Sequence, residues 1–122
     1  MMELFEKMSP DFKHVDERGA LIQLFRGGFK QINVLCSNAG VVRGNHYHKK
    51  SKEAFFVIEG AVEASFKKGA EEKKVVFHKG DFFLVYPFVE HSFFFPDNCI
   101  MLQAYDEPVE KEGGIKDIYK GD

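Results

Sequence analysis

Apolar and polar side chains alternate along most of this chain with a period of two residues. The clearest case is Ala61–Lys67, in which valine, alanine and phenylalanine take turns with glutamate, serine and lysine. Successive side chains of a β-strand point to opposite faces of the sheet, so this segment predicts a strand with one buried and one exposed face. No segment shows a convincing helical period. The pattern therefore predicts an all-β protein.

Further short apolar segments recur at regular intervals and are separated by residues that favour turns. Glu59-Gly60, Lys68-Gly69 and Pro96-Asp97-Asn98 are examples, because glycine and asparagine tolerate positive φ and proline fixes a turn. This spacing is typical of an antiparallel sandwich or barrel. We expect strands at Ala20–Phe25, Phe29–Cys36, Val42–His48, Glu53–Glu59, Ala61–Lys67, Lys73–Phe77, Phe82–Tyr86, His91–Phe95 and Cys99–Tyr105.

Two of these segments are apolar on both faces: Phe55–Ile58 reads FFVI and Phe82–Tyr86 reads FFLVY. A strand of this kind needs a cover on each side, one from the core and one from a partner. Because exposed apolar patches of several hundred Å² usually mark an interface, we predict a homodimer. The alternative is that the N-terminal strands cover the same sheet within one chain.

The chain of 122 residues is long enough for one hydrophobic core and too short for a catalytic domain joined to a second cofactor domain. We therefore expect one domain over residues 1–122. After Tyr105 the sequence becomes charged and contains several glycines, with Ile115, Ile118 and Tyr119 as its apolar anchors. Residues 106–122 are predicted to form a lightly docked tail.

Composition excludes several classes of function. The net charge is −2 with acidic and basic residues interspersed, so the chain has no basic face for nucleic acid. No segment approaches the roughly 20 apolar residues of a membrane span, and the first residues lack the pattern of a secretory signal. Cys36 and Cys99 lie in apolar segments, where we expect reduced, buried thiols. These features predict a cytoplasmic protein without a nucleic-acid or membrane partner.

The candidate chemistry lies in three histidines and one glutamate. His46 and His48 are two residues apart on a predicted strand and share a face, while Tyr47 points the opposite way. Glu53 opens the next strand, and His91 follows a later turn. Three imidazoles and one carboxylate at such positions predict a mononuclear metal site, suited to zinc, nickel, manganese or iron. The alternative is a polar pocket in which the histidines act as acid and base without a metal.

The two clusters resemble the paired signatures of the cupin superfamily. In the first, Gly40 is followed by five residues, the His46-Tyr47-His48 triplet, four residues, Glu53, six residues and Gly60, which is the full pattern. The second, Gly80–His91, keeps the separation of its end residues but lacks the usual glycine after the proline. The resemblance implies a single-domain cupin, which is a double-stranded β-helix or jelly-roll barrel.

Within the cupins, the chain is most similar to the RmlC-like enzymes that act on nucleotide-linked sugars. These are the dTDP-4-keto-6-deoxyglucose 3,4-ketoisomerases, the dTDP-4-dehydrorhamnose 3,5-epimerases and the C-terminal cupin of capsular-polysaccharide enzymes. The resemblance rests on Asp16–Phe25, Val42–Lys50, Gly80–His91 and Asp117–Tyr119. It implies a dTDP- or UDP-linked keto sugar as the bound molecule. It also implies proton transfer next to the ketone, in cell-surface polysaccharide biosynthesis.

Such chemistry needs a base and a group that stabilises the enolate. A neutral His46 or His48 would serve as the base. If both histidines hold a metal that polarises the carbonyl, the base is another residue, for which Tyr47, Tyr86 and Glu90 are the candidates.

Arg43, shortly before the histidines, is the candidate for binding a substrate phosphate, with Arg26 and Lys49 as weaker alternatives. The chain departs from the metal-free ketoisomerases at two places. Glu53 keeps a metal ligand, and the strand before the histidines has Asn33 and Val34 where those enzymes carry an aromatic hydroxyl. The retained glutamate favours the metal-holding cupins of capsular-sugar enzymes.

Two other classes of function stay open. A small dioxygenase would use the same four ligands to hold iron or nickel with open coordination positions. A non-catalytic cupin would bind a small molecule in the same cavity. His14 and His78 lie among lysines and turns, and we expect both to be solvated surface side chains.

Overall fold

The structure is a computed structural model and describes residues 4–109, 114 and 116–121. Its elements are β-strands, which confirms the predicted class, and among the described residues no helix has the length and apolarity of a membrane span. All nine predicted strands are present, while β1, β2 and β12 were not predicted. The strands are β1 (Phe5–Lys7), β2 (Phe12–Asp16), β3 (Gly19–Gln23), β4 (Gln31–Ser37), β5 (Val42–Tyr47), β6 (Glu53–Glu59), β7 (Ala61–Lys68), β8 (Glu71–His78), β9 (Phe82–Val85), β10 (Glu90–Phe94), β11 (Cys99–Tyr105) and β12 (Tyr119–Lys120).

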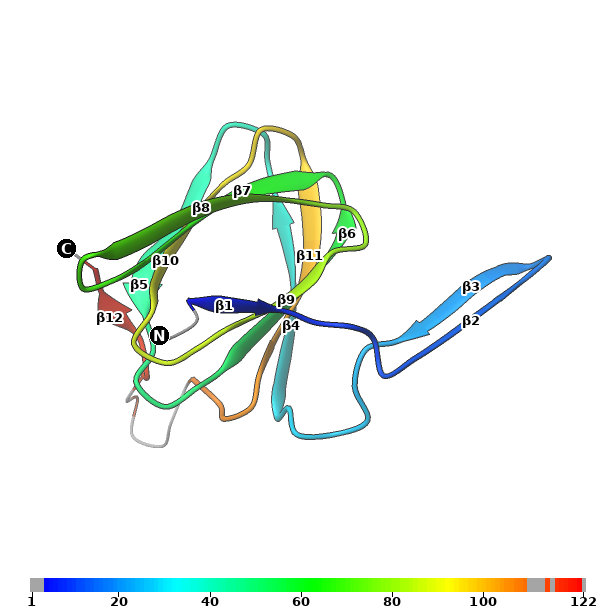
Figure 1. Cartoon of the computed structure of the whole chain (residues 1–122), viewed down its shortest axis with the longest axis horizontal. Coiled ribbons are helices and arrows are strands. Elements are labelled where there is room, and N and C mark those ends of the chain that lie inside the picture. Colours follow the sequence, from blue (N-terminus) through cyan, green and yellow to red (C-terminus); the bar gives the residue numbers. More distant parts are fainter. Residues whose placement is uncertain (1–3, 110–113, 115, 122) are drawn as a thin grey trace.

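Two five-stranded sheets face each other and enclose the interior (Figure 1). The first sheet has the order β1-β9-β6-β11-β4, and the second has the order β12-β5-β10-β7-β8. Neighbouring strands are antiparallel. The chain passes repeatedly from one sheet to the other, which is the winding of a jelly roll. The predicted cupin fold is therefore confirmed, with two facing sheets in place of one closed barrel.

A core rich in phenylalanine fills one part of the interior. Phe77 of β8 and Phe83 of β9 stack with a centroid distance of 3.8 Å, and Phe55 of β6 meets Phe93 of β10 edge to face at 4.9 Å. All four rings are almost completely buried. Burying one such side chain stabilises the fold by about 1.5–3 kcal/mol. Because each pair joins the two sheets, this core fixes how the sheets lie against each other.

The strands that are apolar on both faces are covered twice, as predicted, but their second cover belongs to the same chain. On the outer side of the first sheet, Ala54, Phe82 and Leu84 are buried. The side chains packed there are Met8, Leu24, Phe25, Phe29, Phe56 and Tyr86. The cover comes largely from the connection between β3 and β4. The outer face of β4 stays uncovered, where Ile32 is 55% and Val34 is 62% exposed.

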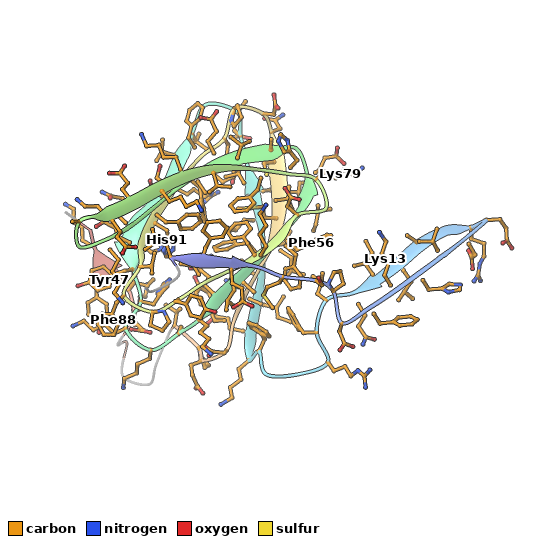
Figure 2. All side chains as sticks on the ribbon, in the orientation of Figure 1. Lys13, Tyr47, Phe56, Lys79, Phe88 and His91 are labelled. Atoms are coloured by element: carbon orange, nitrogen blue, oxygen red, sulfur yellow. The ribbon has the colours of Figure 1, made fainter. Side chains whose placement is uncertain are left out.

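Strands β2 and β3 form a two-stranded hairpin that projects away from both sheets (Figure 1). Figure 2 shows Lys13 on this arm, separated from the rest of the molecule. Both strands carry exposed apolar side chains, which are Phe12, Val15, Leu21 and Ile22. A two-stranded hairpin alone is marginally stable in water, so the arm needs a surface to pack on.

The described part of the C-terminal tail is held more firmly than the predicted light docking. Strand β12 pairs with β5, which places Tyr119 opposite Tyr47, and the two rings stack at 5.5 Å. Asp117 is buried. Of the other predicted anchors, Ile118 is exposed and Ile115 lies outside the described residues. The attachment depends on hydrogen bonds that an apolar pattern does not reveal.

The two cysteines are free thiols in different surroundings. Cys99 is buried, as predicted, but Cys36 is exposed. The prediction of a buried Cys36 is wrong because its side chain lies on the uncovered outer face of β4.

Candidate metal centre

The four predicted ligands meet inside the molecule. His46 lies on β5, His48 follows that strand, Glu53 begins β6 and His91 lies on β10. One ligand atom from each residue lies within 4.8 Å of all the others. His48, Glu53 and His91 are buried, and His46 is half-buried. The sequence-based prediction that these side chains converge is confirmed.

A β-bulge in β5 determines which side chains reach this centre. His91 pairs with His46 and Ser92 pairs with Gly44, so Asn45 is an extra residue between them. Gly44 has φ +98°, and a Cβ atom there would lie 2.8 Å from the carbonyl oxygen of His91. Asn45 itself has φ 64°. Only glycine meets both demands at position 44, because it tolerates positive φ and leaves room for the neighbouring backbone.

Backbone carbonyls fix the orientation of two imidazoles. Nδ1 of His48 lies 2.5 Å from the carbonyl oxygen of Asp117, and Nδ1 of His91 lies 3.0 Å from that of Val89. A carbonyl oxygen can only accept, so each Nδ1 carries the hydrogen. Nε2 of each ring then faces Oε1 of Glu53, at 3.1 Å from His48 and 3.0 Å from His91. An ionised carboxylate also only accepts, so each of these contacts needs either a proton on Nε2 or a metal ion beside both atoms.

The electrostatics of the centre agree with this orientation. Burial by itself would raise the pKa of Glu53, but the charge of His91 and the hydrogen bond from His48 lower it far below its usual range. Burial by itself would lower the pKa of His48, but the hydrogen bond and charge of Glu53 outweigh burial and raise it. An ionised carboxylate is thus held in a fully buried place, where it attracts positive charge.

His46 differs from the other two histidines. Within the described part of the chain its ring makes no hydrogen bond, and it meets the ring of His91 edge to face at 4.9 Å. Burial, together with the charge of His91, lowers the pKa of His46 to about 4. The ring is therefore neutral near pH 7, with a nitrogen lone pair available to a metal or to a proton.

The donor set fits a divalent transition metal. Two ligand atoms at right angles around an ion, each about 2.1 Å from it, are about 3.0 Å apart, which is the spacing of Glu53 Oε1 from the two Nε2 atoms. Nε2 of His91 is buried and has no hydrogen-bond partner among the described residues, although the carboxylate is near. Two histidines and one carboxylate on adjacent positions suit iron, manganese, nickel or zinc.

An open cavity of about 360 Å³ leads to the centre. It is lined by His46, Glu53, His91, Arg43, Leu35, Val42, Gly44, Phe55, Phe93 and Gln103. Arg43 and His46 are three residues apart and would face opposite sides of a regular strand, but the bulge at Asn45 turns both toward the cavity. Arg43 donates to Ser37 Oγ at 2.9 Å and to the carbonyl oxygen of Cys36 at 3.2 Å. The predicted phosphate-binding residue therefore lies beside the ligands.

The other predicted catalytic residues do not line this cavity. Tyr47 faces outward as predicted and stacks between Phe88 and Tyr119, near the lower left of Figure 2. Tyr86 donates its hydroxyl hydrogen to Glu6. Glu90 borders a separate pocket on the outer side of β10.

The two weaker phosphate candidates are also engaged elsewhere. Arg26 binds Asp11 at 2.8 Å, and Lys49 lies 4.2 Å above the ring of Tyr119. Among the residues that the structure describes, His46 and Arg43 are thus the predicted catalytic and phosphate-binding side chains that reach the cavity.

Comparisons with known proteins support this assignment of fold. The sequence model of the polysaccharide biosynthesis C-terminal domain matches residues 14–86, which is more than half of the chain. The chain belongs to this family. The search of the curated proteins found no match to the chain.

Several solved structures have the same fold as this member of the family. The 3,4-ketoisomerase QdtA from Thermoanaerobacterium thermosaccharolyticum, in complex with TDP, is 21% identical, with a TM-score of 0.78 over 88% of this chain and 83% of that chain. The TDP-quinovose 3,4-ketoisomerase WlaRB from Campylobacter jejuni is 13% identical, with a TM-score of 0.80 over 95% and 94%. The rmlC epimerase of Mycobacterium tuberculosis is 18% identical, with a TM-score of 0.70 over 85% and 64%.

Sequence reasoning missed the side chains that orient the ligands. Gln103 of β11 donates to Oε2 of Glu53 at 2.6 Å, and Asn33 of β4 donates to Oε1 of Gln103 at 2.9 Å. Glu53 therefore has one oxygen bound to Gln103 and the other facing the histidines. Asn33 departs from the ketoisomerase pattern. This departure was the signal in the sequence that its strand could have a different role, which is to support Gln103.

Proposed function

We propose that this protein is a sugar-nucleotide isomerase or epimerase of cell-surface polysaccharide biosynthesis. It would move a proton at the carbon next to the ketone of a TDP- or UDP-linked keto sugar. The support is a shared fold with TDP-sugar ketoisomerases, one of which is solved with TDP-4-keto-6-deoxyglucose, and membership of a polysaccharide biosynthesis family. The observation that carries the proposal is the cavity in which His46 and Arg43 lie beside the converging ligands.

In this proposal Arg43 and His46 of the cavity have different roles. The sugar ring enters the cavity, and Arg43 binds a phosphate oxygen at its mouth, since guanidinium groups match phosphate geometry. His46 is neutral and faces the cavity, so it accepts the proton from the carbon next to the ketone and returns it to the new position.

We also propose that His48, Glu53 and His91 hold a divalent metal, with His46 close enough to be a fourth ligand when no substrate is bound. A bound metal would polarise the keto oxygen and stabilise the enolate. The three residues contribute fixed ring orientations and a permanently ionised carboxylate, so little rearrangement is needed on binding.

Exchange of solvent deuterium into TDP-4-keto-6-deoxyglucose, followed by NMR, tests the proposal. We expect exchange with the wild-type protein and a loss of about 100-fold or more with His46→Asn. The matched control is His78→Asn, because His78 is an exposed histidine outside the cavity. An absence of exchange with dTDP- and UDP-linked keto sugars would contradict the proposal, and wild-type exchange in His46→Asn would remove the role of His46.

One observation favours a second candidate function. Two histidines and one carboxylate with free adjacent positions are also the ligand set of non-haem iron oxygenases. The measurement that separates the two candidates is metal analysis of the purified protein, together with thermal shifts against dTDP and UDP. Bound iron with no response to either nucleotide favours the oxygenase, whereas stabilisation by a nucleotide favours the isomerase.

We further propose a homodimer in the cytoplasm. The support for the location is that the cysteines are free thiols, as in reducing compartments. The support for the dimer is the uncovered outer face of β4, with Ile32 and Val34, and the projecting hairpin with its exposed apolar side chains. Both surfaces belong to the same chain, so two copies can cover them reciprocally.

The dimer is tested by light scattering coupled to size-exclusion chromatography. We expect the wild-type protein to run as a dimer and Val34→Lys to shift it toward the monomer. Val76→Lys is the matched control, because Val76 is a similarly exposed valine on β8 of the other sheet. A wild-type monomer at micromolar concentration would contradict this proposal.

A further inference from the structure

The ring of His48 forms a hydrogen bond with a residue near the C-terminal end of the sequence. Its Nδ1 donates to the carbonyl oxygen of Asp117, a residue 69 positions later in the chain. On its other side, the backbone carbonyl oxygen of His48 accepts a hydrogen bond from the N–H of Phe88 at 2.7 Å. The Asp117 bond therefore orients the ring from its Nδ1 side, opposite the Nε2 contact with Glu53, while the Phe88 bond holds the backbone.

The carboxylate of Asp117 is tied to the same loop. It accepts hydrogen bonds from the backbone N–H groups of Lys49 at 2.9 Å and of Lys50 and Ser51 at 3.0 Å each. These three residues lie between His48 and Glu53, the two ligands whose atoms are 3.1 Å apart. Asp117 is 4% exposed, and its own backbone N–H donates to Val109 at 2.8 Å. The residue is therefore fixed from three directions.

These bonds act together on one ligand. The carboxylate holds the loop that joins two ligands, and the carbonyl of the same residue determines which nitrogen of His48 carries hydrogen. If the carbonyl moved away, the ring would lose its acceptor, and the hydrogen could shift to Nε2. In that tautomer Nε2 would donate to Glu53 and would no longer offer a lone pair to a cation.

We propose that Asp117 is a positioning residue for His48, which keeps the hydrogen on Nδ1 and makes Nε2 the atom that is available to a metal ion beside Glu53. The inference rests on the proposed function in one respect, because the centre it orients is the proposed metal and proton-transfer site. It adds that the C-terminal segment is part of the site, although none of the residues described in that segment lines the cavity.

Two readouts on the full-length protein test this proposal. Long-range ¹H–¹⁵N correlation spectra at alkaline pH, where the ring is neutral, report which nitrogen of His48 carries hydrogen. Titration with Co²⁺, followed by its visible absorption, reports the affinity of the centre. We expect one tautomer with hydrogen on Nδ1 in the wild-type protein. We expect a mixture of tautomers and about 10- to 100-fold weaker Co²⁺ binding in Asp117→Ala and Asp117→Asn.

The matched control is Asp81→Asn. Asp81 is also a carboxylate that accepts a backbone N–H, that of His78 at 2.7 Å, and its hydrogen bonds within the described part of the chain go to His78 and Val57, which are not ligands. This variant should lose some stability and keep the Co²⁺ affinity and the wild-type tautomer. If Asp117→Ala does not fold, Asp117→Asn, which keeps the side-chain shape, supplies the same comparison.

The outcomes are distinct. The wild-type tautomer together with wild-type Co²⁺ affinity in a folded Asp117 variant would overturn the proposal and leave Asp117 a structural role alone. If the wild-type protein binds no Co²⁺ and exchanges no deuterium, the proposed function fails, but the tautomer spectra of the metal-free proteins still decide whether Asp117 positions His48.

Discussion

The interior of this protein has an apolar half, formed by stacked phenylalanines, and a polar half, formed by the three histidines and Glu53, and the two halves differ in what stabilises them. In the apolar half, rings such as Phe77 and Phe83 stack on one another, and each contact is supported by several others. In the polar half, the carboxylate of Glu53 and the Nε2 atoms of two histidines converge, and their contacts need a proton or a metal ion. The first half lowers the free energy of the fold by itself, whereas the second is satisfied by an added cation.

Phe55 and Phe93 lie where the two halves meet. Both belong to the phenylalanine core and also line the cavity beside Glu53 and His91. Stability and affinity for a cation therefore come from different residues, so substitutions should separate the two properties.

The largest effect is expected from the apolar half. Phe83→Ala removes a fully buried ring from the stack and should lower the free energy of unfolding by about 3–5 kcal/mol, measured by urea denaturation. The Co²⁺ affinity of the molecules that stay folded should not change. Val76→Ala on the exposed face of β8 is the control, with an effect of about 0.5 kcal/mol or less. A loss of metal affinity in folded Phe83→Ala would show that stability and metal affinity do not depend on different residues.

The next largest effect is expected from the carboxylate of the polar half. Glu53→Gln keeps the shape of the side chain and removes its negative charge, so a bound metal ion loses the one anionic ligand of this set. We expect metal affinity to fall by about 100-fold or more in competition titrations with a chromophoric chelator. Glu63→Gln, on an exposed position of β7, should bind as the wild type does. Unchanged affinity in Glu53→Gln would show that the carboxylate is no ligand.

Lowering the pH should remove the stabilising contribution of the Asp117 carboxylate. The pKa of Asp117 is lowered; burial opposes this, but the N–H groups of Lys49, Lys50 and Ser51 outweigh it. Its stabilising contribution is therefore complete above the ordinary Asp pKa of about 3.9 and is lost as pH falls through the lower folded value. Asp117→Asn should be less stable than the wild type by about 1–3 kcal/mol at pH 7, and the difference should shrink below about pH 4 in denaturation curves. A difference independent of pH would contradict this assignment.

The smallest effect is expected from Gln103. Gln103→Leu has nearly the same volume but leaves Oε2 of Glu53 without its donor, so the carboxylate can turn in the cavity. We expect about tenfold weaker metal binding with little loss of stability, measured by the same chelator competition. Gln23→Leu on the hairpin is the control. If Gln103→Leu binds metal as tightly as the wild type, the second oxygen of Glu53 needs no anchor.

The sequence predicted the strands and the ligands because both depend on local patterns. A two-residue period and turn residues locate strands. His46, His48 and Glu53 are close in sequence and also lie close together in the folded chain. Gln103 and Asp117 were missed because their roles depend on register and on the return of the chain end. Gln103 reaches Glu53 only because β11 pairs with β6, and Asp117 reaches His48 across 69 positions.

The uncovered face of β4 and the free hairpin were missed for a related reason. The apolar pattern predicts that a strand needs two covers, but it does not say which segment supplies them. Leu24, Phe25 and Phe29 turned out to cover β6 and β9, which leaves the surface next to them bare. The periodicity of apolar residues shows which strands have to be buried, whereas the path of the chain determines which segment covers them.

The extra residue in β5 has a consequence for how related chains can diverge. Deleting Asn45 would restore a regular strand and turn the guanidinium of Arg43 to the outside, while the two histidines after it would keep their places. A change of length by one residue, with no replacement of any functional side chain, would thus remove an anion contact from the mouth of the site.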